Sequence, residues 1–253
     1  MKTEKRIALV TGAGSGIGRA SALALLEDGF RVVLAGRREA ELRNTADMAG
    51  KNAANALPVS ADVADPESVK RLFATLMDRH GRLDVLFNNA GVSLPPMPSE
   101  DVTPEQWDYI MRINVTGSFL CAQQALRIMK NQTPQGGRII NNGSISAHAP
   151  RVKAMAYAVS KHAITGLTKS ICLDYRDDNI CCSQIDIGNV DSGLLTTVQG
   201  GVRPQPAGGS RAEAKFSVSL AADAIVYLAN LPLEANVPFM TLMANAMPYM
   251  GRG

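Results

Sequence analysis

The 253-residue sequence has little that could hold a metal ion. Its three histidines are scattered, and none of its four cysteines stands at the two-residue spacing typical of zinc ligands. We therefore predict no metal site, and we interpret the cysteines as small apolar side chains in a reducing compartment. They are Cys121, Cys172, Cys181 and Cys182.

Long apolar runs and blocks of like charge are also missing. No stretch approaches the roughly 18 uninterrupted apolar residues of a membrane helix, and the apolar run 7–10 is too brief for a signal peptide. The net charge is only +3 and the basic residues are scattered, so no stripe for nucleic acid is present. We expect a cytoplasmic protein that binds neither nucleic acid nor membrane.

The patterning that is present indicates an α/β fold. Apolar residues make up 46% and charged residues 19%, which is typical of a globular domain. Short β-branched runs alternate with longer amphipathic segments, which favours βαβ units around a parallel sheet. The expected strands are 6–10, 31–35, 56–59, 83–87, 137–142, 181–187 and 237–242, and the expected helices are 16–28, 39–50, 66–80, 104–130, 154–175 and 219–230. We predict one Rossmann-type, doubly wound domain over residues 1–253, with a seven-stranded parallel sheet and helices on both faces.

One stretch, residues 189–216, is rich in glycine and proline and follows the sixth strand. Long loops inside compact domains are often lids, and ligands of parallel sheets bind beyond the carboxyl ends of the strands. We predict a substrate-binding lid here, with a plain surface loop as the alternative. Within it, Arg203 and Arg211 could meet an acidic substrate or be solvated surface charges.

The segment Thr11-Gly12-Ala13-Gly14-Ser15-Gly16-Ile17-Gly18 joins the first strand to a helix. Glycines here permit a tight turn and let backbone N–H groups approach a pyrophosphate, which the helix N-terminus also attracts. The spacing differs from G-x-G-x-x-G, so the strand and helix context carries the prediction. The residues expected to bind a dinucleotide are Gly12, Ser15, Gly16, Ile17 and Gly18.

The second strand ends in Gly36-Arg37-Arg38, with no acidic residue at its tip. An acid there would accept hydrogen bonds from the ribose 2′-hydroxyl of NAD, whereas arginine pairs with the 2′-phosphate of NADP. We therefore favour NADP(H) over NAD(H), with Arg37 and Arg38 as phosphate ligands. The alternative is an ordinary pair of surface arginines at the start of a helix.

Polar groups also stand near the ends of later strands. Asn88-Asn89-Ala90-Gly91 follows the fourth strand and Ser144 follows the fifth. Tyr157 and Lys161 share one face of a helix and could point at one ligand, although such pairs are often only surface neighbours.

With these motifs the chain resembles the single-domain branch of the short-chain dehydrogenase/reductase family over essentially its whole length. Residues 11–18 resemble the family's T-G-x-x-x-G-x-G and residues 88–91 its N-N-A-G. The resemblance implies a catalytic tetrad of Asn114, Ser144, Tyr157 and Lys161. It also implies a homotetramer or homodimer. The family's cofactor contacts would come from Asp62 and Val63 at the adenine. The remaining cofactor contacts that it implies are Asn89, Ala90, Gly91, Tyr157, Lys161, Gly188, Val190 and Ser192.

Two departures from the family pattern concern the substrate end. Ile187 stands where the family usually has proline, and Ser192 stands where it has threonine, which can still donate a hydrogen bond. The missing proline relaxes the turn and affects the pose of the lid more than the hydride chemistry. The methionines of the C-terminal tail favour packing over a pocket-lining role.

We predict an oxidoreductase that transfers a hydride between NADP(H) and a carbonyl or alcohol substrate, acting as a carbonyl reductase in vivo. In this hypothesis Ser144 hydrogen-bonds the substrate oxygen and Tyr157 exchanges its proton. Lys161 favours the ionised Tyr157 and grips the nicotinamide ribose, and Asn114 supports a water relay. An NADP-binding sensor or scaffold without turnover would not need these four residues, and a methyltransferase would leave most of them without a purpose.

Overall fold

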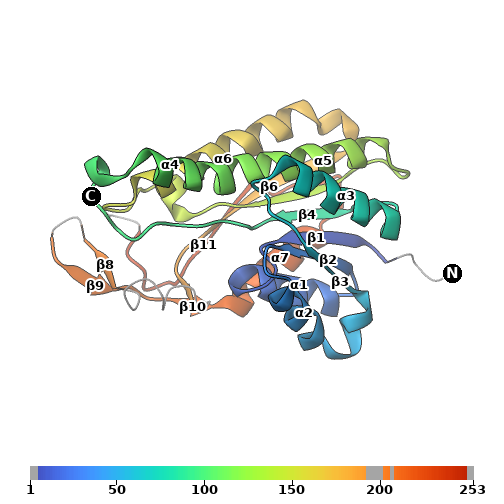
Figure 1. The fold of residues 1–253 in the computed structure, drawn as a ribbon, viewed down its shortest axis with the longest axis horizontal. Coiled ribbons are helices and arrows are strands. Elements are labelled where there is room, and N and C mark those ends of the chain that lie inside the picture. The colour runs from blue at the N-terminus through green and yellow to red at the C-terminus, as the bar shows by residue number, and fades with distance from the viewer. Residues whose placement is uncertain (1–4, 192–201, 206–207, 250–253) are drawn as a thin grey trace.

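The structure is a computed structural model that describes residues 5–191, 202–205 and 208–249, apart from the side chain of Arg203. Seven parallel strands form one sheet in the order β11-β6-β5-β4-β1-β2-β3 (Figure 1). They are β1 (Ile7–Thr11), β2 (Arg31–Gly36), β3 (Ala56–Ser60), β4 (Val85–Asn88), β5 (Gly137–Asn142), β6 (Ile180–Ile187) and β11 (Phe239–Leu242). The predicted seven-stranded parallel sheet is confirmed.

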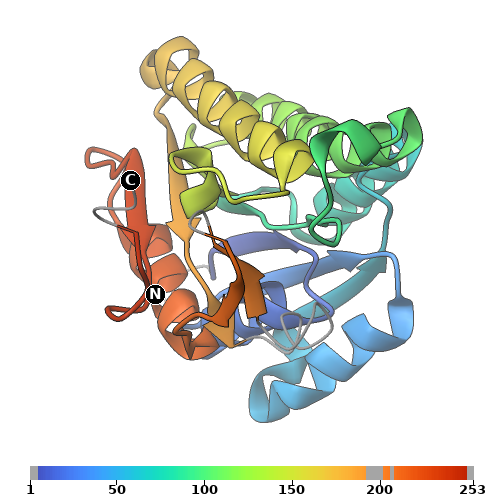
Figure 2. The same cartoon turned by 90° about the vertical axis from the view of Figure 1, so that its left-hand side faces the viewer.

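Helices cover both faces of this sheet (Figures 1 and 2). One face carries α1 (Gly16–Glu27), α2 (Glu39–Met48) and α7 (Val218–Asn230), and the other carries α3 (Pro66–His80), α4 (Pro104–Met111), α5 (Gly117–Asn131) and α6 (Met155–Asp174). Successive strand residues face opposite cores because side chains alternate along a strand. In β1, Ala8 and Val10 pack toward α1 and α7, whereas Leu9 packs toward α3 and α5.

Local signals in the sequence set the ends of several helices. The Asp65 side chain accepts a hydrogen bond from the N–H of Glu67 and precedes Pro66 at the first turn of α3. Gly81, with φ of 72°, caps the C-terminus of the same helix. At α4, Thr103 and Gln106 form a reciprocal capping box.

The strand order reverses beside β1, because β4 and β2 flank it on opposite sides. In open α/β sheets the crevice for ligands lies outside the carboxyl ends of the strands at such a reversal. The loops after β1, β2, β4, β5 and β6 all reach this edge, so the topology places the predicted site residues together.

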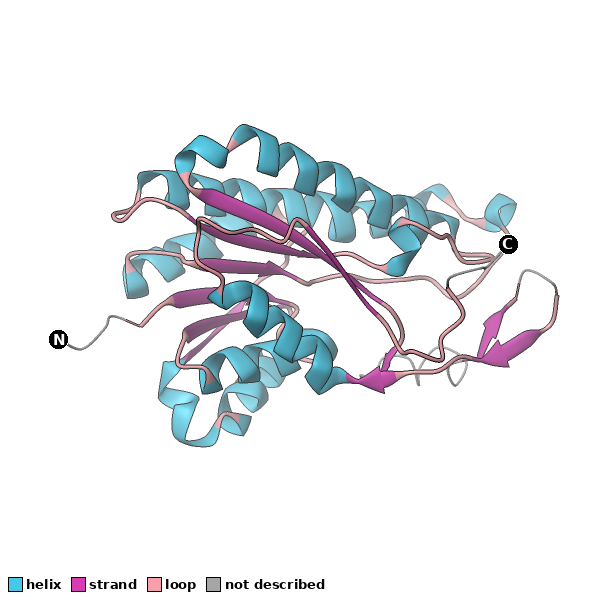
Figure 3. Ribbon diagram, turned by 180° about the vertical axis from the view of Figure 1, so that it is seen from behind, coloured by secondary structure: helices cyan, strands magenta, loops and turns pink. Residues whose placement is uncertain are grey.

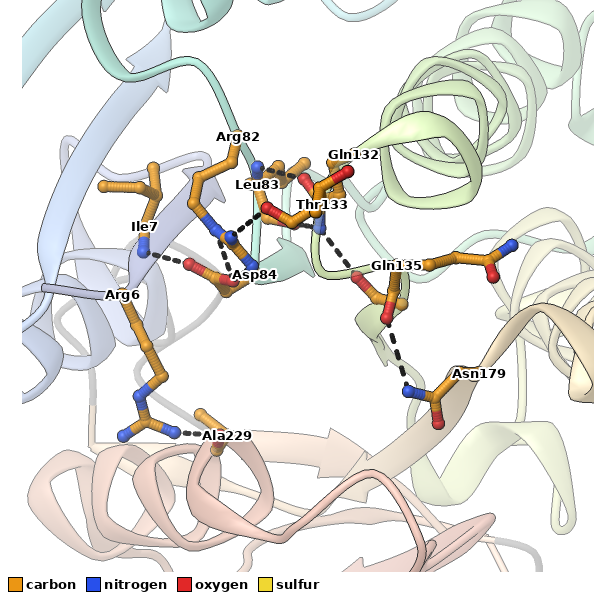
Figure 4. Close-up of polar contacts among 11 residues, drawn as sticks. Arg6, Ile7, Arg82, Leu83, Asp84, Gln132, Thr133, Gln135, Asn179 and Ala229 are labelled. Carbon is orange, nitrogen blue, oxygen red and sulfur yellow. Dashed lines mark hydrogen bonds and ion pairs between the residues drawn. The ribbon is translucent and has the colours of Figure 1, made fainter. Parts of the chain in front are cut away.

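The opposite edge of the sheet is closed by polar side chains (Figure 4). The Asp84 carboxylate accepts a hydrogen bond from the N–H of Ile7 at 2.7 Å and forms an ion pair with Arg82 at 2.7 Å. The Gln132 side chain binds both the N–H and the carbonyl oxygen of Leu83, at 2.9 Å each. The cavity lies at the carboxyl edge instead, among the loops that follow the strands.

The prediction of one continuous helix over 104–130 is wrong. It is divided into α4 and α5 by a π-helical segment, Arg112–Thr116, that contains Asn114. Single π turns inside α-helices are frequent at functional sites. The helix expected over 39–50 ends at Met48 and is followed by a 3-10 helix, Gly50–Asn55. Further 3-10 helices are Ser99–Asp101, Ile145–Ala147 and Arg176–Asp178.

The segment 189–216 contains short strands that the sequence did not predict. β7 (Val190–Asp191) pairs in parallel with β10 (Phe216–Ser217), and β8 (Val202–Pro204) pairs with β9 (Ser210–Ala212) as a hairpin. Figure 3 shows this hairpin beyond the carboxyl edge of the main sheet. Among the described residues, no helix is long and apolar enough to span a membrane.

Candidate active site

The turn between β1 and α1 depends on glycine at several positions. Gly12 and Gly16 have positive φ angles of 68° and 54°. A Cβ on Gly18 would lie 2.3 Å from the carbonyl oxygen of Gly12, so backbone contact requires glycine there. Ser15 makes no side-chain cap and the first turn of α1 has no acidic residue, which leaves uncapped N–H groups that suit a phosphate. These features fit a nucleotide pyrophosphate.

The tip of β2 presents two exposed arginines to the same cavity, Arg37 and Arg38. Neither guanidinium has a hydrogen bond or ion pair with another residue in the described part of the chain. Arg19 differs, because it forms an ion pair with Glu41 at 2.7 Å and donates to Thr45 Oγ1 at 3.1 Å. Arg37 and Arg38 therefore supply donors that are free to bind an anionic group.

A hydrogen-bond network fixes the loops after β1, β4 and β5 relative to one another. Thr11 Oγ1 accepts from the N–H groups of Asn89 at 2.9 Å and Ala90 at 3.0 Å. Asn142 Nδ2 donates to Asn89 Oδ1 at 2.9 Å, and the Asn142 carbonyl accepts from Lys161 Nζ at 2.7 Å. The buried Lys161 ammonium is thereby held at the carboxyl end of β5 while keeping further donors for a ligand.

Tyr157 and Lys161 lie one turn apart on α6, and both line the cavity. Ser144 lines it from the loop after β5. The N–H of Ser144 donates to Asp186 Oδ1 at 2.9 Å, and its Oγ accepts from the N–H of Ser146 at 3.1 Å. Because the Asp186 carboxylate is fully buried and also contacts His148 Nε2 at 2.7 Å, it fixes the backbone that carries Ser144.

Asn114 is buried behind the cavity wall and is not one of its lining residues. Its Oδ1 accepts from the N–H of Val92 at 2.8 Å, and its Nδ2 donates to the Val92 carbonyl at 2.9 Å and to Ser160 Oγ at 3.0 Å. Ser160 Oγ in turn donates to the Tyr157 carbonyl at 2.8 Å. In this structure Asn114 links the loop after β4 to the helix that carries Tyr157.

The cavity has a volume of about 410 Å³, within the range of small-molecule sites. It is continuous from the arginines at β2 to Tyr157. The predicted site residues that line it are Gly12, Ser15, Ile17, Arg37, Arg38, Asp62, Val63, Asn89, Ala90, Gly91, Ser144, Tyr157, Lys161, Gly188 and Val190. Gly16 and Gly18 shape the turn without lining the cavity, and Ser192 lies outside the described residues.

Sequence reasoning missed a polar cluster at the other end of the cavity. Arg151 and Asn189 line the cavity and both contact Glu213, which comes from the segment before β10. No motif spacing links three residues on three separate loops, so no signal in the sequence could have grouped them. Arg211, considered above as a contact for an acidic substrate, is exposed on β9 and is not among the lining residues.

The C-terminal segment closes the back of the site. Met247 is buried against Ile145 and Ala244, as the packing interpretation of the tail predicts for that methionine. A Cβ on Gly188 would lie 2.9 Å from the Cβ of Met243, so glycine lets this segment pack directly behind the turn after β6.

Comparison with known proteins agrees with this geometry. Residues 6–201 match the model of the short chain dehydrogenase family. The chain is 35% identical over 193 residues to a 3beta-hydroxysteroid dehydrogenase of Mediterraneibacter gnavus, covering 76% of this chain and 68% of that protein.

Two solved structures extend the likeness to nearly the whole chain. A 3-ketoacyl-(acyl-carrier-protein) reductase from Brucella melitensis, complexed with NADH, has a TM-score of 0.83 and 26% identity over 94% of this chain and 96% of its own. A variant of actinorhodin polyketide ketoreductase, with NADPH, has a TM-score of 0.84 and 25% identity, covering 97% of this chain and 98% of its own.

The chain belongs to the short-chain dehydrogenase/reductase family. It is an oxidoreductase that acts on an alcohol or carbonyl group with a nicotinamide dinucleotide.

Proposed function

We propose that this chain, as one domain over residues 1–253, is an NADP(H)-dependent carbonyl reductase that converts a ketone or aldehyde to an alcohol. The observation that carries the proposal is the single cavity that joins Arg37 and Arg38 at the tip of β2 to Tyr157 and Lys161 on α6. Arginines suit the extra phosphate of NADP, and the tyrosine and lysine suit proton transfer to a developing alkoxide. NAD(H) is the less favoured cofactor.

The cofactor-binding residues follow from their positions along this cavity. The glycine turn with Ser15 and Ile17 would hold the pyrophosphate, Arg37 and Arg38 the 2′-phosphate, and Asp62 with Val63 the adenine. Asn89, Ala90 and Gly91 would line the channel, and Gly188, Val190 and Ser192 would meet the nicotinamide. When bound, NADPH supplies the hydride.

The chain's own residues manage the proton. Ser144 donates a hydrogen bond to the substrate oxygen, and Tyr157 gives that oxygen its proton as negative charge develops on it. The Lys161 ammonium stabilises the oxygen of Tyr157 after the proton has left. Asn114 supports this arrangement by holding Val92 and Ser160, and in our proposal it also supports the water that returns a proton from solvent.

The test is an absorbance assay of NADPH and NADH consumption with ketones, sugars, steroids and acyl thioesters. We expect turnover with at least one carbonyl class and a preference for NADPH. The variant Tyr157→Phe should abolish turnover while NADPH binding, measured by fluorescence titration, is retained. NADPH binding without turnover on any carbonyl would instead support a sensor or scaffold, and a fully active Tyr157→Phe would overturn the assignment of the proton donor.

We also propose that residues 189–216 serve as the substrate lid, since Asn189, Val190 and Pro204 contribute to the cavity. We place the protein in the cytoplasm, where its four free thiols would stay reduced.

We propose a homotetramer or homodimer, because apolar side chains of α4, α5 and α6 are exposed on one side of the sheet. These are Tyr109, Phe119, Met155 and Val159. Light scattering after gel filtration measures the assembly, and a monomer would refute it.

A further inference from the structure

We propose that Arg151, held in place by Glu213 and Asn189, hydrogen-bonds a second, uncharged oxygen of the substrate. The substrate class would then be a ketone that carries another carbonyl or hydroxyl oxygen at a distance from the reacting one. This inference rests on the proposed carbonyl reductase function and adds a specificity-determining residue to it.

Three loops meet in this cluster. Arg151 lies between β5 and α6, Asn189 follows β6, and Glu213 lies between β9 and β10. Arg151 Nη1 donates to Glu213 Oε2 at 2.7 Å and Nη2 donates to Asn189 Oδ1 at 2.9 Å. Asn189 Nδ2 closes the triangle by donating to the same Glu213 oxygen at 2.9 Å. The Arg151 side chain is therefore fixed before any ligand enters.

Anchoring of the third loop makes the cluster rigid. The N–H of Phe216 donates to the Asn189 carbonyl at 3.1 Å, and β10 pairs with β7 at Val190. The side chains of Arg151 and Glu213 are 16% and 0% exposed. A ligand in the cavity would meet a preorganised guanidinium, which lowers the entropic cost of binding.

The donors of Arg151 are not exhausted by these contacts. A guanidinium has five N–H donors in a planar fork, and the hydrogen bonds to Glu213 and Asn189 use two of them. Arg151 lines the same cavity as Ser144 and Tyr157, and we infer that its remaining donors serve the compound bound beside them. An oxygen acceptor on the substrate is the chemical group that such donors recognise.

Charge in the cluster favours an uncharged acceptor. Burial by itself raises the pKa of Glu213, but hydrogen bonds from Arg151, Asn189 and Gln205 and the positive charge of Arg151 outweigh it and lower the pKa to about 2. Glu213 is therefore ionised at neutral pH and already supplies a carboxylate to Arg151. A carboxylate on the substrate would lie close to that negative charge, whereas a ketone or hydroxyl oxygen would not be repelled.

Several residues that line the same cavity agree with a neutral substrate, because they are apolar or carry only a hydroxyl group. From the loops after β4 and β5 these are Ser93, Leu94, Pro96, Ser146, Val152 and Ala154. An organic ketone would bury its carbon skeleton against the apolar side chains while its second oxygen reaches Arg151.

The experiment compares three groups of ketones of matched size. The first carries no second oxygen, and the second carries a hydroxyl or a second carbonyl at increasing distance from the reacting carbonyl. The third carries a carboxylate. The main variant is Arg151→Met with Glu213→Gln, because changing both residues leaves no unpaired buried charge. Arg176→Met is the matched control, since Arg176 is exposed, lies outside the proposed lid and does not line the cavity. Each protein is assayed with NADPH for kcat and KM.

We expect the wild type to prefer one of the oxygenated ketones. The double variant should lower its kcat/KM by about 10- to 100-fold, mostly through KM, since a hydrogen bond to a charged group is lost. The kcat/KM of the double variant for the plain ketone, and that of the Arg176→Met control for every ketone, should change less than about twofold. The single variant Glu213→Gln should raise kcat/KM for the carboxylated ketone by about tenfold, because it removes the repelling charge.

Equal losses for plain and oxygenated ketones would show that the cluster is only structural and would overturn this inference. A wild-type preference for the carboxylated ketone would overturn it as well. If none of the ketones turns over although NADPH binds, the proposed function itself fails, which is a different result from a loss of selectivity in an active enzyme.

Discussion

The Lys161 ammonium lies 5.6 Å from the centre of the Tyr157 ring, on the same face of α6. Its hydrogen bond to the Asn142 carbonyl keeps it there, so the charge beside the tyrosine is built into the fold. A positive charge beside the tyrosine favours the phenolate that forms when Tyr157 gives up its proton.

Replacing this charge tests its role directly. Lys161→Met should lower kcat by about a hundredfold, because the charge that assists general acid catalysis by Tyr157 is removed. Lys169→Met, on the same helix but with its ammonium 5.9 Å from the Phe239 ring centroid, is the control and should keep normal turnover. Steady-state assays at saturating NADPH measure both. Wild-type kcat in Lys161→Met would contradict the proposed mechanism.

Cofactor choice is predicted to depend on the arginines at the tip of β2. Changing Arg37 and Arg38 together to Gln should lower the NADPH-to-NADH ratio of kcat/KM by about thirtyfold, which corresponds to about 2 kcal/mol of charge-assisted hydrogen bonding. Arg43→Gln is the control, because Arg43 pairs with Glu39 at 2.6 Å on the exposed side of α2. An unchanged ratio in the double variant would show that neither arginine contacts the 2′-phosphate.

Two glycines in helices should respond in opposite ways to alanine. Gly18→Ala should reduce the free energy of unfolding by at least about 2 kcal/mol and abolish NADPH binding, since its Cβ would collide with the Gly12 backbone. Gly166→Ala in α6 should stabilise the protein by up to about 1 kcal/mol, because no atom lies within 4 Å of the added Cβ. Urea unfolding followed by circular dichroism separates the two, and a tolerated Gly18→Ala would refute the close approach.

Acid stability should depend on Glu213. Its pKa in the folded protein, about 2, is below the ordinary value of 4.5. The carboxylate therefore stabilises the fold above about pH 4.5, and this contribution is lost as the pH falls toward about 2. Glu213→Gln should be less stable than wild type near pH 7, with a smaller difference near pH 3, in urea unfolding. The exposed Glu234→Gln is the control, and a difference independent of pH would contradict the assignment.

One cysteine should react well before the others. The side-chain hydrogen bond with Cys182 lowers the pKa of Cys172 to about 7, whereas burial raises the pKa of Cys121 to about 12. Because the thiolate is the nucleophile, iodoacetamide should label Cys172 first, at a rate that rises with pH and levels off above about 7. Peptide mass mapping identifies the site, with Cys172→Ser as control. Preferential labelling of Cys121 would contradict this prediction.

Much of the fold and site could be predicted because the signals are local. The glycine turn follows from residues 11–18, and the shared face of Tyr157 and Lys161 follows from their spacing of four in a helix. Strand patterning placed the seven strands of the sheet, although the ends of several differ by one or two residues.

Other features could not be predicted because they depend on contacts between distant segments. The π turn at Asn114 interrupts a pattern that reads as one helix, and it accompanies the hydrogen bonds of Asn114 to Val92. The strands within 189–216 form by pairing with partners far along the chain or across a turn rich in glycine. No periodicity marks such pairs.

The sequence by itself determined the order of strands and helices, the glycines of the first crossover and the pair of arginines at the second strand. Tertiary structure decided which side chains reach the cavity: it placed Asn114 behind the wall and brought Arg151 to Glu213, which is 62 positions away. The physical reason is that helical and strand periodicity act over a few neighbouring residues, whereas a buried ion pair forms only where the packed sheet brings separate loops together.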